Sequence, residues 1–206
     1  MPSFFLSILI PAAFICLVFF GWWYNSPKQK GKRGEQRVYD VLSHLSEEYH
    51  VLDDIVLKTE NSTTQIDHII VSKYGIFTIE TKNYRGNIYG EDYRKEWTQL
   101  IVTNVTYPKK WWKTYTYVTK NRFYNPVKQS IGHALRIREL LFAFPYIKIV
   151  PIVVFAGDAF LKNVKSNHHV IYKENILEVI SRYKAIYIKD DDVQTILDII
   201  KVNNVR

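Results

Sequence analysis

Two apolar runs joined by a short polar turn constrain this chain more than any other part of its sequence. Residues 65–82 read QIDHIIVSKYGIFTIETK, and the runs rich in Ile, Val, Thr and Phe flank the segment SKYG. This pattern predicts two antiparallel strands and a tight turn. With a two-residue loop, Ser72 lies opposite Gly75, and Asp67 then lies opposite Glu80. A three-residue loop would instead turn the two acids toward different faces, unless a bulge restored the alignment.

The two-residue loop brings charges of opposite sign to one end of the hairpin. Directly opposed residues share a face at a Cβ separation of about 5 Å, and period-2 alternation adds Lys82 to the face of Asp67 and Glu80. Two carboxylates that close repel each other unless a cation lies between them. A hard divalent ion with oxygen ligands, Mg²⁺ or Mn²⁺, suits such a site. The alternative is that Asp67, Glu80 and Lys82 are ordinary solvated residues on the outer face of a strand. An Asp followed further along the chain by Glu-x-Lys, written D…ExK, occurs by chance in many proteins.

Further motifs surround the hairpin and carry a family resemblance. They are GKRGEQRVYDVL (31–42), QIDHIIVSKYGIFTIETKNYRGNIYG (65–90), EWTQ (96–99) and NPVKQSIGHALRIREL (125–140). Together they closely resemble the nuclease-related domain (NERD) family, which is usually placed in the PD-(D/E)xK nuclease superfamily. The resemblance covers about Gly31 to Phe155. Its most specific part runs from the IDH segment to the ExK triad, without a gap or substitution.

The resemblance implies a fold, a reaction and a set of site residues. The fold class is α/β, a restriction-endonuclease-like αβββαβ core with a mixed central sheet. The reaction is metal-dependent hydrolysis of nucleic-acid phosphodiester bonds, with DNA as the expected substrate and Mg²⁺ or Mn²⁺ as the cofactor. Asp67, Glu80 and the backbone carbonyl of Thr81 are expected to hold the metal. Lys82 would orient the attacking water or stabilise the phosphorus centre, and the family's first-helix acid corresponds to Glu35.

Two amides and one histidine are further candidates. Gln129 belongs to the NPxxQ segment of the family pattern and falls four residues from His133, so both are expected to point from one helical face toward the hairpin. Gln99 is a candidate neutral ligand or water-orienting group, or else an ordinary surface amide. His68 alternates to the face opposite Asp67, and we interpret it as a core or supporting histidine rather than a ligand.

An uncharged apolar segment, residues 4–24, precedes all of these motifs. About 20 such residues cross a hydrocarbon core of about 30 Å, so the segment predicts one N-terminal transmembrane helix that contacts the lipid bilayer. A basic cluster at positions 28–33 follows it. The positive-inside rule therefore predicts a single-pass protein of the cell membrane, with the N-terminus outside and the remainder cytoplasmic. A cleaved signal peptide would need basic residues before the segment and a small-residue cleavage site after it, and the sequence has neither.

The remaining chain is long enough for one domain with a proper core. We expect a transmembrane anchor over residues 1–25, a linker over 26–30, a nuclease-like domain over 31–157 and a helical extension packed on the core over 158–206. The single cysteine, Cys16, excludes an intrachain disulfide and a cysteine-based zinc site.

The periodicity predicts individual elements on either side of the hairpin. These are a helix from Gly31, a strand over 49–57, a helix from Asn125 to about Phe144, an apolar strand over 147–155, a short strand near 169–172, and helices near 174–183 and 191–201. The apolar strand reads as central in the sheet, although Pro151 favours an edge or a bulge.

A basic and aromatic stretch, residues 107–124, is a candidate nucleic-acid surface. The chain has 28 Lys+Arg against 20 Asp+Glu, a net charge of +8 that suits a polyanionic partner or an anionic membrane surface. Cations contact phosphates, and flat rings stack on unpaired bases. The candidate contacts are Lys109, Lys110, Trp111, Trp112, Lys113, Lys120 and Arg122. The alternation in this stretch equally suits a half-buried hairpin with a basic polar face.

Three functional hypotheses follow from the sequence. The first is a membrane-anchored, metal-dependent nuclease. The second is a catalytically silent nuclease-like module that binds nucleic acid or a partner protein at the membrane. The third is a membrane-surface scaffold whose basic excess serves lipid only.

Overall fold

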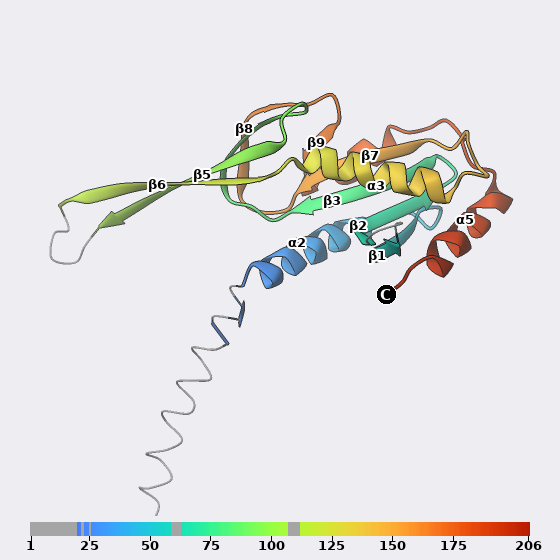
Figure 1. Cartoon of the computed structure of the whole chain (residues 1–206), viewed down its shortest axis with the longest axis horizontal. Coiled ribbons are helices and arrows are strands. Elements are labelled where there is room, and N and C mark those ends of the chain that lie inside the picture. Colours follow the sequence, from blue (N-terminus) through green and yellow to red (C-terminus); the bar gives the residue numbers. More distant parts are fainter. Residues whose placement is uncertain (1–19, 22, 25, 59–62, 107–111) are drawn as a thin grey trace, which may run out of the picture.

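The computed structural model describes residues 20–206 except 22, 25, 59–62 and 107–111 (Figure 1). Its elements in chain order are α2 (Pro27–Leu42), β1 (His50–Lys58), β2 (Thr63–Ser72), β3 (Gly75–Lys82), β4 (Gly86–Glu91), β5 (Glu96–Thr106), β6 (Thr114–Tyr124), α3 (Pro126–Leu140), β7 (Ile149–Phe155), β8 (Ala159–Lys165), β9 (His169–Tyr172), the 3₁₀ turn η2 (Lys173–Asn175), α4 (Ile176–Ser181) and α5 (Asp190–Val202).

The strands form two mixed sheets. The main sheet has the order β1-β2-β3-β7-β9, with β1, β2 and β3 antiparallel and β3, β7 and β9 parallel. The second sheet has the order β6-β5-β4-β8. The predicted α/β class is confirmed, and the expected helix, three strands, helix and strand occur in that order. Strands β4, β5 and β6 lie in the chain between the third strand and the second helix.

The central hairpin has the register of a two-residue loop. Its pairs run from Ser72 opposite Gly75 to His68 opposite Ile79, so the loop Lys73–Tyr74 is confirmed. Gly75 has φ +130°, and a Cβ there would lie 2.7 Å from the carbonyl oxygen of Lys148. This turn therefore requires glycine, because the backbone conformation and the contact both disfavour a side chain.

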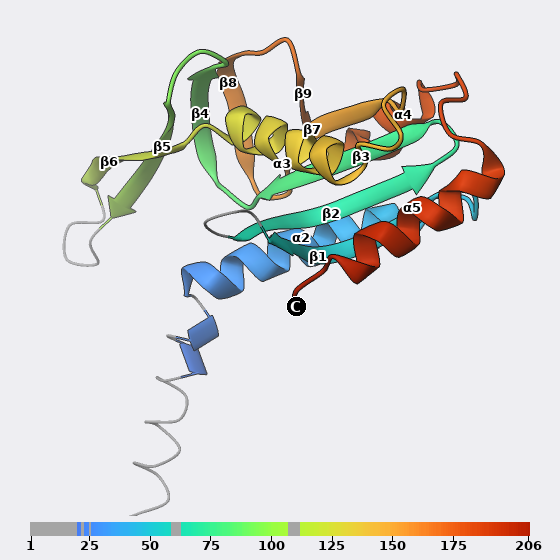
Figure 2. The same ribbon diagram turned by 45° about the vertical axis from the view of Figure 1, so that its right-hand side comes forward.

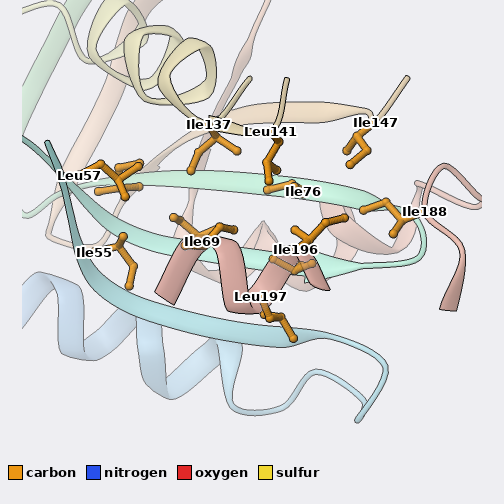
Figure 3. Packing of buried hydrophobic residues seen from close by; sticks show 13 residues of the cluster. Ile55, Leu57, Ile69, Ile76, Ile137, Leu141, Ile147, Ile188, Ile196 and Leu197 are labelled. Carbon is orange, nitrogen blue, oxygen red and sulfur yellow. The ribbon is translucent and has the colours of Figure 1, made fainter. Parts of the chain in front are cut away.

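Helices cover both faces of the main sheet (Figure 2). On one face, Ile69 and Ile76 pack with Ile137 of α3 and with Ile196 and Ile200 of α5 (Figure 3). On the other face, Phe77 and Ile79 pack with Val38 and Leu42 of α2 and with Ile180 of α4. Alternate residues of β3 enter opposite cores, as the period of a strand requires.

Several expected boundaries differ from the observed ones. Helix α2 begins at Pro27 after the N-cap Ser26, so most of the predicted linker 26–30 is helical. Helix α3 ends at Leu140 rather than near Phe144. Strand β7 lies inside the main sheet, between β3 and β9, as its apolar sequence predicts.

The C-terminal region is not only helical. The predicted short strand at 169–172 is present as β9, and β8 is a further strand that was not predicted. The two strands extend the main sheet and the second sheet respectively. Residues 158–206 therefore complete the sheets as well as packing helices against them.

The predicted membrane segment, residues 4–24, lies outside the described residues except for positions 20, 21, 23 and 24. Within the described part of the chain, no helix is both long enough and apolar enough to cross a bilayer. The anchor stays a prediction.

Strands β5 and β6 form a long hairpin that projects from the body of the protein (Figures 1 and 2), which we call the arm. Almost every residue of β6 is exposed, so the half-buried interpretation of this stretch is wrong. Lys109, Lys110 and Trp111 lie outside the described residues. The described candidates, Trp112, Lys113, Lys120 and Arg122, are all exposed, and their contact with nucleic acid stays a prediction.

Candidate functional site

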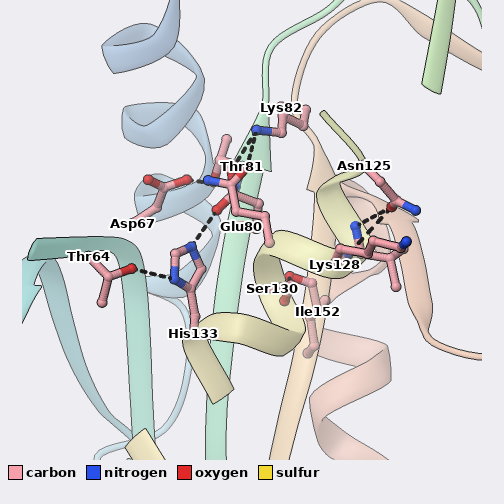
Figure 4. A network of polar contacts seen from close by, with 12 residues as sticks. Thr64, Asp67, Glu80, Thr81, Lys82, Asn125, Lys128, Ser130, His133 and Ile152 are labelled. Carbon is pink, nitrogen blue, oxygen red and sulfur yellow. Dashed lines mark hydrogen bonds and ion pairs between the residues drawn. The ribbon is translucent and has the colours of Figure 1, made fainter. Parts of the chain in front are cut away.

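The backbone ladder between β2 and β3 ends just before the predicted acid pair. Its last pair is His68 opposite Ile79. At the end of β3, the backbone N–H of Thr81 donates a hydrogen bond of 2.7 Å to Oδ2 of Asp67 (Figure 4). The Asp67 carboxylate thus replaces a backbone acceptor where the two strands separate. Asp67 and Glu80 were expected to be directly opposed, but they do not form a pair in the β2–β3 ladder.

Glu80 is buried, with 3% exposure, and both of its carboxylate oxygens have partners. Lys82 Nζ lies 2.7 Å from Oε1, and His133 Nε2 lies 3.0 Å from Oε2 (Figure 4). His133 Nδ1 in turn lies 3.2 Å from the hydroxyl of Thr64. These contacts offset the cost of burying the carboxylate.

Two side chains of helix α3 point toward Glu80 and Lys82 at the end of β3. Gln129 Oε1 accepts a hydrogen bond of 3.1 Å from Lys82 Nζ, and His133 contacts Glu80. The prediction that Gln129 and His133 point together toward the hairpin is confirmed. His133 was not among the predicted site residues, because its only signal in the sequence is the four-residue spacing from Gln129.

A pocket of about 260 Å³ lies between α2 and the end of the hairpin. Its lining residues are Lys32, Glu35, Gln36, Tyr39, Asp53, Asp54, Asp67 and His68. Four of them are carboxylates and one is a lysine, so the pocket attracts cations. Glu35 and Asp67 line it together, as the resemblance implied. Glu80 is not among the lining residues, because its carboxylate contacts α3.

The electrostatics of Asp67 reflect its burial and its neighbours. Burial is the largest cause that raises the pKa of its carboxyl, and the negative charges of Glu80 and Glu35 act in the same direction. The hydrogen bond from Thr81 and the nearby His68 oppose them, and the pKa rises from 3.8 to about 7. The surroundings of Asp67 therefore disfavour its anionic form. A bound cation would reverse this preference.

The donor set fits a hard divalent ion, although no complete metal centre is assembled. In the described part of the chain, no three His, Cys, Asp or Glu side chains are grouped so that they could hold an ion. The oxygen donors of Glu35 and Asp67 share the pocket, and such ligands suit Mg²⁺ or Mn²⁺. The buried hydroxyl of Thr81, which has no hydrogen-bond partner among the described residues, also lies at this end of the hairpin.

The two remaining candidates, His68 and Gln99, make contacts that hold parts of the fold together. His68 is 2% exposed, and its Nδ1 lies 2.7 Å from Oδ1 of Asp53, as expected of a supporting histidine. Gln99 is 7% exposed, so it is not a surface amide. It donates to the carbonyl of Arg85 over 2.8 Å and accepts from Asn121 over 3.1 Å. These contacts tie together parts of the second sheet and give Gln99 no contact with Asp67 or Glu80.

The close approach of α2 to β3 depends on Gly34. A Cβ at this position would lie 2.6 Å from Cβ of Asn83 and 3.4 Å from a methyl carbon of Thr81. Alanine is normally better than glycine inside a helix by about 0.5–1 kcal/mol. We expect Gly34→Ala to lower the free energy of unfolding by about 1–3 kcal/mol instead, because α2 must move away from the hairpin.

Gly132 of α3 provides the matched control for this prediction. A Cβ there meets no atom within 4 Å, so Gly132→Ala is expected to stabilise the protein by the usual helical increment of about 0.5–1 kcal/mol. Urea denaturation of both variants measures the difference. Equal stabilisation by the two substitutions would contradict the proposed role of Gly34.

Comparison with known proteins adds a family assignment to this geometry. A family model described as "nuclease-related domain" matches residues 30–156, which include α2, the central hairpin, α3 and β7. An uncharacterised protein of Bacillus anthracis is 34% identical over 175 residues, which cover 82% of this chain and 74% of that protein. No solved structure matches the chain.

Proposed function

Because the chain belongs to the nuclease-related domain family, we propose that it is a metal-dependent nuclease that hydrolyses phosphodiester bonds of nucleic acid, DNA being the expected substrate. One observation carries this proposal. Asp67 is half-buried near two other acids, and its desolvation together with the negative charges of Glu80 and Glu35 raises its pKa to about 7, at the strand end that also supplies Lys82. This arrangement is unfavourable for the protein alone and becomes favourable when a divalent cation binds.

We assign metal binding to Asp67, Glu80 and the backbone carbonyl of Thr81, with Glu35 as the supporting acid from α2. Their oxygen atoms suit Mg²⁺ or Mn²⁺. When bound, such an ion lowers the pKa of a water ligand and offsets charge that builds up on the phosphodiester. The acidic lining of the pocket and the raised pKa of Asp67 support this assignment.

Lys82 is the residue that we assign to the reacting phosphate and water. Its side chain is 17% exposed, and two of its three N–H groups donate to Glu80 and Gln129. The third can donate to an attacking water or a phosphate oxygen. Because two contacts fix the ammonium in advance, it needs no reorganisation when negative charge develops.

The second candidate function is a catalytically silent module that binds nucleic acid or a partner protein. The contacts of Glu80 favour it, because this carboxylate is 3% exposed and both of its oxygens are already engaged. Under this hypothesis, Lys82 and His133 neutralise a buried structural acid, and binding of a metal ion is not needed.

The proposal extends to the location of the protein. Residues 4–24 would anchor the chain in the cell membrane, and the basic residues that follow would hold the nuclease-like domain at the cytoplasmic face. Nucleic acid would meet the basic residues of the arm, among them Lys113, Lys120 and Arg122.

A cleavage assay on the full-length protein in detergent separates the two candidates. Labelled double-stranded DNA, single-stranded DNA and RNA are incubated with Mg²⁺, Mn²⁺ or EDTA, and binding is measured in parallel by fluorescence anisotropy. The nuclease hypothesis predicts cleavage of at least one substrate with metal and none with EDTA. Binding without cleavage under every condition would support the silent module, and absence of both would contradict both.

A further inference from the structure

The edge strands of the two sheets are protected unequally. Exposed edges offer free backbone groups to other strands, and proteins block them with charges, irregularities, short strands or covering segments. Strand β1 is irregular at Asp54, which has φ +53°, and the C-terminus covers it through the Leu57–Asn204 bridge and a 2.9 Å bond from Val205 N–H to the carbonyl of Val56. Strand β9 has only four residues.

Strand β8 carries Lys162 and Lys165, so it also has a charged edge. Over its distal half, strand β6 has no charge and no irregularity, it is not short, and no other described strand pairs with its outer edge. It is 11 residues long, its ladder with β5 is continuous, and β5 is its only strand neighbour in the described part of the chain. Its segment Thr114–Thr119, TYTYVT, contains no charge, proline or glycine. This segment is a regular strand edge that nothing in its own sequence blocks.

The arm also exposes apolar surface on a two-stranded ribbon. Val102 and Val118 are opposed across the ladder and are 54% and 62% exposed. Isolated two-stranded hairpins are marginally stable in water. A further strand beside β6 would bury part of this surface and add backbone hydrogen bonds.

The composition of the distal arm indicates the chemistry of its partner. Residues 97–106 and 114–119, the paired strands of the distal arm, contain no charged side chain, and the segment that connects them carries the lysines, Lys113 among them. A nucleic-acid surface needs cations, so nucleic acid would contact the connecting segment and the base of the arm rather than the strand edge at 114–119. The cations of β6 lie nearer its base, where Arg122 approaches Glu96 at 3.8 Å. Hydrocarbon is also a poor partner, because polar side chains form their own contacts along the arm, such as Thr116 with Asn104 at 2.9 Å. An uncharged β-strand suits this surface best.

We propose that the segment Thr114–Thr119 pairs with the same segment of a second copy of this chain. The pairing is antiparallel and two-fold symmetric, and it joins two four-stranded sheets through their arms. With Val118 at the centre, Lys120 lies opposite Thr116 and Arg122 lies opposite Thr114 of the second copy. No like charges are then opposed, so the strand is complementary to itself. The inference does not depend on the proposed nuclease activity.

Cysteine cross-linking of the full-length protein tests the pairing directly. In a Cys16→Ser background, Val118→Cys and Tyr117→Cys each place one thiol at one of two alternative centres of the paired strands, where opposed Cβ atoms lie about 5 Å apart. Leu135→Cys on α3, which is 57% exposed, measures random collision. We expect at least one arm variant to form disulfide dimers about tenfold faster than the control, since a directly opposed pair is within reach of a disulfide. Rates equal to the control for both arm variants would overturn the proposal.

Charge placed on the open edge provides the second measurement. Thr116→Lys is expected to weaken self-association at least about tenfold in analytical ultracentrifugation of the full-length protein in detergent, because a lysine blocks edge pairing. Phe160→Lys, on the already charged β8 edge and 66% exposed, is the matched control and should leave association unchanged. A monomeric parent protein, or a dimer that Thr116→Lys leaves intact, would overturn the proposal.

Discussion

Replacement of Asp67 by Asn is expected to slow metal-dependent cleavage strongly while it stabilises the protein at pH 8. Loss of the anionic ligand should lower the turnover number by about 10³-fold, since the charge that positions the metal is missing. The amide oxygen can still accept the hydrogen bond from the Thr81 N–H. The substitution thus removes a charge that the folded protein holds at a cost and keeps the local contact.

The effect on stability has a defined pH dependence. The carboxyl of Asp67 has a pKa of about 7 in the folded protein against an ordinary value of 3.8. Between these values the folded state binds a proton that the unfolded state has lost, so the stability of the parent protein falls as pH rises from about 4 to about 7. The amide that replaces the carboxyl cannot ionise. We therefore expect Asp67→Asn to be more stable than the parent above pH 7, on the order of 2 kcal/mol, with little difference near pH 4.

Thermal denaturation from pH 4 to pH 8 in EDTA measures this difference. Asp198→Asn, an exposed carboxylate of α5, is the control and should change little across the range. Added Mg²⁺ should raise the melting temperature of the parent protein and leave Asp67→Asn unaffected, because the ion binds only the intact site. Equal stability of parent and variant at pH 8, or retention of cleavage by the variant, would refute this role for Asp67.

Replacement of Lys82 by Arg is expected to lower the turnover number by about 10²–10³-fold with little change in Mg²⁺ binding, because only the transition state uses this ammonium fully. Arginine keeps the positive charge beside the buried Glu80, so the protein should fold. Its planar guanidinium cannot occupy the ammonium position between Glu80 and Gln129. Lys82→Met removes the charge as well and should also destabilise the protein, since it leaves Glu80 with His133 alone.

Single-turnover cleavage and the Mg²⁺-induced thermal shift separate these contributions. Lys73→Arg, at the turn of the same hairpin and paired with Glu48, is the matched control and should cleave at the parental rate. A Lys82→Arg variant with turnover within about threefold of the parent would show that the ammonium has no catalytic role. A variant that loses the Mg²⁺-induced shift would instead assign Lys82 to metal binding.

The sequence alone determined the local features of this protein. The polar turn and alternating apolar residues of the central hairpin predicted its two-residue loop, since register depends on residues close in the chain. Helix α3 starts at the predicted Asn125-Pro126, because a helix start also depends on residues close in the chain. The motifs from Gly31 to the strand near Phe155 predicted the family, which the family model over residues 30–156 confirms.

Only the tertiary structure decided which partner each charged residue of the hairpin meets. Glu80 contacts His133, which lies 53 residues further along the chain, while Asp67 lines a pocket with Glu35 of α2. Both arrangements depend on how α2 and α3 pack against the sheet, and the approach of α2 depends on the absence of a side chain at Gly34. The position of β6 at the edge of the second sheet is likewise a property of strand order. Contacts between distant segments follow from the packing of whole elements, which no local pattern in the sequence specifies.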